Sequence, residues 1–258
     1  MSKFALPRTI LITGATGGIG GALAEVYAEP NNVLILQGRN SIRLAELAVI
    51  CEEKGARVLI RVLDMRNLKE LTAWLRMICE QEKVDLVIVN AGVNNNIGLQ
   101  GAGESWEDVQ ALIEVNVLAA MATVDAVLPS MRARGEGQIA LMSSLAAYFG
   151  LPITPSYCAS KAALKVYGEA LRGWLHSEGI RVNVVMPGYV ESKMCRDMPG
   201  PKPFLWPAEK AARTIKRGLA RNQSRISFPF PLNLGTWFLS VLPAGISEWI
   251  LRLLNYAG

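Results

Sequence analysis

Tyr157 and Lys161 are the two residues whose types and spacing most clearly allow chemistry. They lie four residues apart in a segment with helical periodicity, so both side chains fall on one helix face. A free tyrosine has a pKa of about 10, and a nearby cation lowers the pKa of an acid by roughly 1–3 units. The pair can therefore transfer protons near neutral pH, and Ser144 lies thirteen residues upstream. A solvated surface pair is the alternative interpretation of this spacing.

Short apolar runs alternate with longer amphipathic segments along most of the chain. The runs are rich in Ile, Val and Leu without strict alternation, which is typical of strands buried on both faces. Repeated strand–helix units predict one α/β domain of the Rossmann type, a doubly wound parallel sheet of about seven strands. The predicted strands are Thr9–Thr13, Val33–Leu36, Arg57–Val62, Leu86–Asn90, Gln138–Met142, Arg181–Val185 and Arg225–Phe228. The predicted helices are Ile19–Ala28, Ser41–Glu53, Leu68–Glu82, Trp106–Met131, Ser156–Ser177 and one from Pro207 to about Arg221.

A glycine-rich loop follows the first predicted strand directly. Glycines let the backbone turn tightly and approach a pyrophosphate, while the next helix offers free N–H groups and positive potential at its N-terminus. An ordinary strand-to-helix turn is the alternative, but the preceding strand and the second strand–helix unit favour a dinucleotide site. The cofactor contacts expected from this loop are Gly14, Thr16, Gly18, Ile19 and Gly20.

The end of the second predicted strand indicates which dinucleotide binds. An NAD site has Asp or Glu there, about 20 residues beyond the loop, to accept a hydrogen bond from the ribose 2′-hydroxyl. This chain has Gln37-Gly38-Arg39-Asn40 instead. Arg39 can pair with a 2′-phosphate, so we predict NADP(H) over NAD(H); a solvated Arg39 with either cofactor is the alternative. Asp64, after the third strand, either meets the adenine edge or caps the following helix.

Composition narrows the class of protein. The chain has 258 residues and a formal charge of +5, without a stripe of Lys and Arg, so nucleic-acid binding is not indicated. Four cysteines without C-x-x-C spacing indicate reduced thiols, and the single histidine, His176, argues against a metal site. Residues 2–7 are too short and mixed for a signal peptide, so we expect a cytoplasmic protein.

Six short elements in a fixed order resemble the short-chain dehydrogenase/reductase family over roughly Thr9 to Arg221. They are the family's T-G-x-x-x-G-x-G loop, its N-A-G element, a helix asparagine, a serine, Y-x-x-x-K and P-G followed by a hydroxyl residue. Here they read Thr13, Gly14, Gly18 and Gly20; Asn90-Ala91-Gly92; Asn116; Ser144; Tyr157 with Lys161; and Pro187-Gly188 followed by Ser192. The resemblance places Val190 among the expected cofactor contacts as well.

The resemblance implies an enzyme that interconverts a carbonyl and a secondary alcohol. Tyr157 would exchange a proton with the substrate oxygen, and Ser144 would hydrogen-bond the same oxygen. Lys161 would lower the Tyr157 pKa and bind the nicotinamide ribose, with Asn116 supporting a water relay. The N-A-G element would hold the central sheet and the adenosine side of the cofactor.

Two positions depart from the family pattern. Gly17 stands where many NADP-preferring members have a basic residue, so the cofactor preference depends on Arg39 alone. Ser192 replaces the usual threonine and keeps its hydroxyl.

The last part of the chain has a different pattern. Residues 190–206 are expected to form a loop that serves as a substrate lid, closing a cofactor-binding domain of residues 1–228. Residues 229–258 are strongly apolar, with two short predicted helices at Leu234–Leu242 and Ser247–Leu254 that are too short to span a bilayer. This extension could be a substrate lid, a subunit interface or, through 229–256, a peripheral membrane contact.

Three functions are compatible with these patterns. The leading one is an NADP(H)-dependent reductase or dehydrogenase acting on a small, apolar carbonyl or alcohol, assembled as a homodimer or homotetramer. A catalytically inactive NAD(P)-binding regulator is the second, although such proteins typically lose the tyrosine or lysine that this chain keeps. A sugar-modifying enzyme of the same fold is the third, and usually has a larger C-terminal domain.

Overall fold

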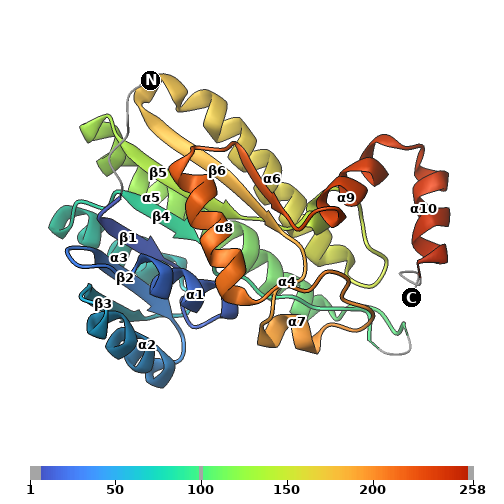
Figure 1. Cartoon of the computed structure of the whole chain (residues 1–258), viewed down its shortest axis with the longest axis horizontal. Coiled ribbons are helices and arrows are strands. Elements are labelled where there is room, and N and C mark those ends of the chain that lie inside the picture. The colour runs from blue at the N-terminus through green and yellow to red at the C-terminus, as the bar shows by residue number, and fades with distance from the viewer. Residues whose placement is uncertain (1–6, 99–100, 255–258) are drawn as a thin grey trace.

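The computed structural model describes residues 7–98 and 101–254, and its centre is a seven-stranded sheet (Figure 1). All six strand pairs are parallel, and the order is β3-β2-β1-β4-β5-β6-β7. The chain thus runs outward from β1 to β3, returns to β4 beside β1, and continues to β7. The strands are β1 Thr9–Ile12, β2 Val33–Gly38, β3 Arg57–Val62, β4 Leu86–Val89, β5 Gly137–Met142, β6 Ile180–Pro187 and β7 Arg225–Phe228. The predicted doubly wound fold is confirmed.

Helices cover both faces of the sheet, so successive strand residues enter two different cores. Leu11 of β1 packs into the core under α3, α5 and α6, whereas Ile10 and Ile12 pack into the core under α1, α2 and α8. This explains the unbroken apolar runs, because neither face of the central strands meets water. The covering helices are α1 Gly18–Tyr27, α2 Ser41–Glu53, α3 Leu68–Gln81, α4 Trp106–Ile113, α5 Ala119–Arg134, α6 Pro155–Trp174 and α8 Ala208–Ala220.

The predicted helix Trp106–Met131 contains a π-helical turn at Glu114–Leu118 that joins α4 to α5. The whole stretch Trp106–Arg134 is long and apolar enough to cross a membrane by length and composition alone. Its apolarity has a structural cause, since α5 packs against α3 and buries side chains such as Val124 and Val127. Helices at the core of a folded domain pass the same test of composition.

The C-terminal segment has more helix than the sequence predicts. A short helix, α7 Lys193–Asp197, lies within the segment predicted as a loop. The two predicted apolar helices exist with shifted bounds, as α9 Leu232–Val241 and α10 Ala244–Leu253. They project beyond the end of the sheet (Figure 1). The prediction about a signal peptide concerns residues 2–7, of which 2–6 lie outside the described part of the chain.

Candidate active site

One cavity of about 1480 Å³ follows the carboxyl ends of strands β1 to β6. Open α/β sheets bind ligands at this edge, close to the point where the strand order reverses. Every predicted site residue except Asn116 lines the cavity. The lining ones are Gly14, Thr16, Gly18, Ile19, Gly20, Arg39, Asp64, Asn90, Ala91, Gly92, Ser144, Tyr157, Lys161, Pro187, Gly188, Val190 and Ser192.

The loop after β1 is held by hydrogen bonds from the segment after β4. The Thr13 hydroxyl accepts from the backbone N–H groups of Asn90 and Ala91, at 3.0 and 3.1 Å. The Asn90 amide donates to the carbonyls of Thr13 and Gly14, at 3.0 and 3.1 Å. Gln37, a buried residue to which the sequence assigned no role, accepts from the Gly14 N–H at 2.9 Å and donates to the Leu63 carbonyl. These bonds fix the loop beneath the cavity.

The shape of the loop fits a bound pyrophosphate. Helix α1 begins at Gly18, and no side chain caps it, so its first N–H groups face the cavity without a competing oxygen. Gly14 has a φ of 65°, which favours glycine, and a Cβ there would lie 2.7 Å from the Ala91 Cα. A Cβ at Gly20 would lie 2.3 Å from the Gly14 carbonyl oxygen. The residues present therefore form a cradle that side chains would fill.

Two arginines line the cavity beside this cradle, after the end of β2. Arg39 is exposed just beyond β2, and Arg43, which the sequence did not single out, lines the same part of the cavity from the first turn of α2. The sequence could have identified Arg43 by its position four residues, about one helical turn, after Arg39. Asp64 also lines the cavity, but Arg66 hydrogen-bonds its carboxylate and holds its pKa below the usual value.

Asp64 does not cap the next helix, so that alternative is wrong. The cap of α3 is Asn67, whose side-chain oxygen accepts from the Glu70 N–H. Asp64 instead stays at the cavity wall, where the adenine alternative places it.

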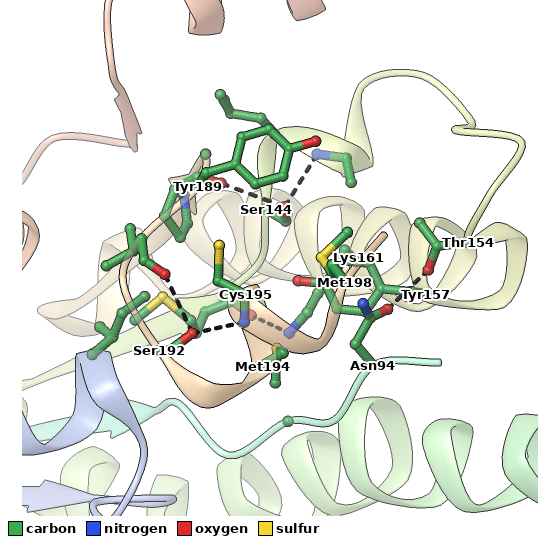
Figure 2. A pocket seen from close by; sticks show the side chains of 18 of the residues that line it. Asn94, Ser144, Thr154, Tyr157, Lys161, Tyr189, Ser192, Met194, Cys195 and Met198 are labelled. Carbon is green, nitrogen blue, oxygen red and sulfur yellow. Dashed lines mark hydrogen bonds between the residues drawn. The ribbon is translucent and has the colours of Figure 1, made fainter. Parts of the chain in front are cut away.

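Tyr157, Lys161 and Ser144 line the same cavity (Figure 2). Tyr157 and Lys161 lie one turn apart on α6, and the lysine Nζ is 5.5 Å from the centre of the tyrosine ring. Lys161 is 4 % exposed, and its Nζ donates to the Met142 carbonyl at 2.9 Å. A Cβ at Gly92 would come within 3.3 Å of that Nζ, so the glycine keeps the cation accessible from the cavity.

The two adjacent serines after β5 have different surroundings. Ser143 is buried, and its hydroxyl donates to the Lys161 carbonyl at 2.7 Å. Ser144 has a half-buried side chain whose hydroxyl accepts from the Ala146 N–H at 3.2 Å and donates to the Pro187 carbonyl at 3.4 Å. The Ser144 hydroxyl therefore stays at the cavity wall, whereas the Ser143 hydroxyl holds α6 onto the sheet.

Burial sets the protonation of this group. It raises the pKa of Tyr157 to about 12, while the hydrogen bond to Ser144 acts in the opposite direction. It lowers the pKa of Lys161 to about 8. The predicted lowering of the Tyr157 pKa by Lys161 is therefore wrong for the protein's own residues, because loss of solvent around the phenol dominates the shift and only the hydrogen bond to Ser144 opposes it. These residues keep the phenol protonated at neutral pH.

Asn116 lies one layer behind the cavity wall. It is fully buried in the π-helical turn, a feature that is frequent at functional sites. Its amide donates to the Val93 carbonyl at 2.9 Å and to the Ser160 hydroxyl at 3.0 Å, and its oxygen accepts from the Val93 N–H. Asn116 thus joins the segment after β4 to the helix that carries Tyr157 and Lys161.

Residues 190–206 form a loop whose ends are pinned together. Val190 and Trp206 pair as an isolated bridge, and the Glu191 N–H donates to the Trp206 carbonyl at 2.9 Å. Ser192 caps α7 by accepting from the Cys195 N–H at 3.0 Å. The loop contributes Met194, Cys195 and further residues to the cavity wall (Figure 2).

Comparison with known proteins matches this site to a family. A sequence model of the family described as short chain dehydrogenase matches residues 8–201. The chain belongs to the short-chain dehydrogenase/reductase family. An uncharacterized oxidoreductase of Myxococcus xanthus is 35 % identical to this member over 96 % of the chain and 98 % of its own length. Mouse 17-beta-hydroxysteroid dehydrogenase 13 is 30 % identical over 95 % of the chain and 86 % of its own length.

A solved structure confirms the fold of this short-chain dehydrogenase/reductase. The short-chain dehydrogenase of Sphingobium yanoikuyae, solved with NADPH, superposes with a TM-score of 0.80 over 95 % of each chain, at 24 % identity. The chain is therefore an oxidoreductase of this family with a Rossmann fold.

Part of the wall at the apolar end of the cavity comes from residues beyond those that the family model matches. Helices α9 and α10 form part of its wall, and Leu239 and Leu251 are buried between them against Phe149, Leu151 and Tyr189. Within the described ranges, 7–98 and 101–254, there is no cluster of three or more His, Cys, Asp or Glu that could hold a metal ion. All four cysteines are free.

Proposed function

We propose that the chain is an NADP(H)-dependent oxidoreductase that interconverts a carbonyl and a secondary alcohol, with Tyr157 as general acid and base. The observation that carries the proposal is a single cavity that runs from the glycine cradle, past Ser144, Tyr157 and Lys161, to an apolar end. Such a cavity brings a cofactor and a substrate to one proton-transfer group.

Each residue of the central group has a distinct role in this proposal. Bound NADP(H) supplies or accepts the hydride, and its oxidised ring carries a positive charge. Tyr157, kept protonated by burial, donates its proton to the substrate oxygen during reduction. Ser144 hydrogen-bonds the same oxygen and orients the phenol. Lys161, charged below its pKa of about 8, binds the cofactor ribose and stabilises the phenolate left behind.

Asn116 is the positioning residue of the group. Because it joins the segment after β4 to α6, it holds Tyr157 and Lys161 at a fixed distance from the cradle. The predicted water relay through Asn116 belongs to this proposal as well.

Arg39 supports NADP(H) over NAD(H), and its removal tests the preference. Arg39→Ala removes a charge-assisted contact worth about 1.5–3 kcal/mol, so kcat/KM for NADPH should fall at least about tenfold. The value for NADH should stay unchanged, and an equal fall for both cofactors would contradict the preference. Gly38→Asp is a poorer test, because a Cβ at Gly38 would lie 2.9 Å from the Thr16 side chain.

An apolar substrate fits the far end of the cavity. Its wall there includes Leu145, Phe149, Leu151, Phe238 and Leu239. The name of the mouse relative, a 17-beta-hydroxysteroid dehydrogenase, agrees with a bulky apolar alcohol or ketone of acyl, lipid or steroid type. A free sugar would leave its hydroxyl groups unpaired against these side chains.

The experiment is NADPH oxidation by the full chain over ketones of graded length and polarity. We expect kcat/KM to rise with apolar size, and a free ketose to be reduced far more slowly. Turnover of the ketose without turnover of apolar ketones would contradict the substrate class. NADPH binding without turnover of any ketone would instead support the inactive regulator.

The remaining sequence predictions stay part of this proposal. Residues 1–228 would form the cofactor-binding domain, with 190–206 as a substrate lid and 229–258 as an apolar extension. The chain would assemble as a homodimer or homotetramer, which light scattering of the purified protein measures directly. A cytoplasmic location is likewise proposed.

A further inference from the structure

Helices α9 and α10 each expose a regular apolar stripe to solvent. The α9 stripe follows i, i+3, i+4, i+7 spacing and the α10 stripe follows i, i+3, i+7, which is the periodicity of one helix face. Monomers rarely expose such large apolar groups together without a partner. The seven residues, called here the outer face, are Leu234, Trp237, Phe238, Val241, Ile246, Trp249 and Leu253, each at least 42 % exposed.

The same two helices are also apolar on their inner side. Leu239 and Leu251 are buried against the cavity wall, and the Ser247 hydroxyl donates to the Leu239 carbonyl at 2.8 Å, which joins α10 to α9. A helix that covers the core of a protein in water usually has one polar face. Helices α9 and α10 are therefore apolar both on the side that lines the cavity and on the side that faces solvent.

The cavity reaches the surface beside the outer face. Phe204, Phe238 and Leu254 line the cavity and are nevertheless 52, 52 and 56 % exposed. They mark an apolar mouth that a substrate would cross on its way to Tyr157. A second copy of the chain seated on the outer face would cover this mouth.

The charge pattern favours a lipid membrane, and not a second copy of the chain, as the occupant of the outer face. Between residues 229 and 254 the only charged residues are Glu248 and Arg252, although 49 residues of the whole chain are charged, 27 basic and 22 acidic. Tryptophans beside a basic residue on short apolar helices are typical of segments that lie in the interface of a membrane. The net charge of +5 suits an anionic lipid surface.

We propose that the outer face inserts into one leaflet of a phospholipid membrane, so that an apolar substrate passes from the lipid through the mouth at Phe204, Phe238 and Leu254 into the cavity. The route of the substrate rests on the proposed function, whereas membrane binding does not.

The test is flotation of the full chain with vesicles of phosphatidylcholine, alone and mixed with phosphatidylglycerol. The test variant is Trp237→Ser with Trp249→Ser, because neither tryptophan lines the cavity. The matched control is Trp106→Ser with Trp174→Ser. These two tryptophans lie outside α9 and α10 and are 72 and 59 % exposed. Burying one such side chain in the membrane favours the bound state by about tenfold. The test variant should therefore bind vesicles at least about tenfold more weakly than the wild type.

We expect the wild type and the control to float with vesicles, more completely with phosphatidylglycerol, and the test variant to stay behind. All three should reduce a short water-soluble ketone at one rate, while the test variant alone loses rate on a long ketone delivered in vesicles. A wild type that does not float, or a test variant that floats equally well, would overturn the proposal. So would a wild-type dimer that the test variant converts to monomers without any vesicle binding. Failure of the soluble-ketone assay would count against the proposed function alone.

Discussion

The two ends of the active-site cavity are held by different interactions. At the cofactor end, backbone and amide hydrogen bonds join the β1 loop to Asn90, Ala91 and Gln37, and a Cβ at Gly20 would meet the main chain at 2.3 Å. At the substrate end, apolar side chains of α9 and α10 form part of the wall, and a Cβ at Gly235 of α9 would meet nothing within 4 Å.

This difference has a consequence for specificity. The phosphates and ribose of a dinucleotide need fixed donors at fixed positions, so the cofactor end tolerates little change in shape. The substrate end instead depends on apolar area, which many side chains can supply. We therefore expect substitutions to be costly at the first end and mild at the second.

The largest expected effect on stability is at Gly20. Gly20→Ala forces a methyl group into the Gly14 carbonyl, which cannot move without breaking the loop, so the variant should lose about 3 kcal/mol of unfolding free energy. NADPH binding should weaken with it. The matched control is Gly21→Ala on the same helix, where the new Cβ would lie an ordinary 3.4 Å from Ala15. Urea unfolding compares the two, and equal stabilities would contradict a rigid cofactor end.

Lys161 lies between the two ends of the cavity. We expect it to lower the stability of the fold while it supports activity. Its pKa falls from an ordinary 10.5 to about 8, so holding it charged in the fold at pH 7 costs about 3 kcal/mol. The cost is complete below pH 8 and disappears as the pH rises to 10.5, where the unfolded chain also loses its proton.

Lys161→Met removes this cost and loses the hydrogen bond to Met142, worth about 1 kcal/mol. The variant should be about 2 kcal/mol more stable than wild type at pH 7 and nearly inactive, with the gap in stability closing towards pH 10. Chemical unfolding at several pH values measures it. A variant that is less stable than wild type at pH 7 would show that burying the charged Lys161 does not destabilise the fold.

The smallest expected effect is at the substrate end. Gly235→Ala fills open space inside α9 and should stabilise the protein by about 0.5–1 kcal/mol through helix propensity. Thermal unfolding detects the rise, and turnover of a short ketone should be unaffected. A destabilised Gly235→Ala protein would indicate that the substrate end is packed as tightly as the cofactor end.

The same contrast explains what the sequence could predict. Local spacing predicts the strands, the glycine loop and the Tyr157–Lys161 pair, because the residues of a short motif determine the local backbone conformation. The π-helical turn around Asn116 has no such signal, and its bonds join residues 23 and 44 positions apart. The raised pKa of Tyr157 and the wall formed by α9 and α10 also arise only when distant segments pack together.

The central claim is that Tyr157 is the proton donor between the two ends of one cavity. The most direct test is Tyr157→Phe, with NADPH affinity measured by fluorescence titration and single-turnover reduction of an apolar ketone measured alongside. The account predicts unchanged NADPH affinity and a rate lower by about 10²–10⁴-fold, the usual contribution of a general acid. Near-normal turnover in this variant would contradict it.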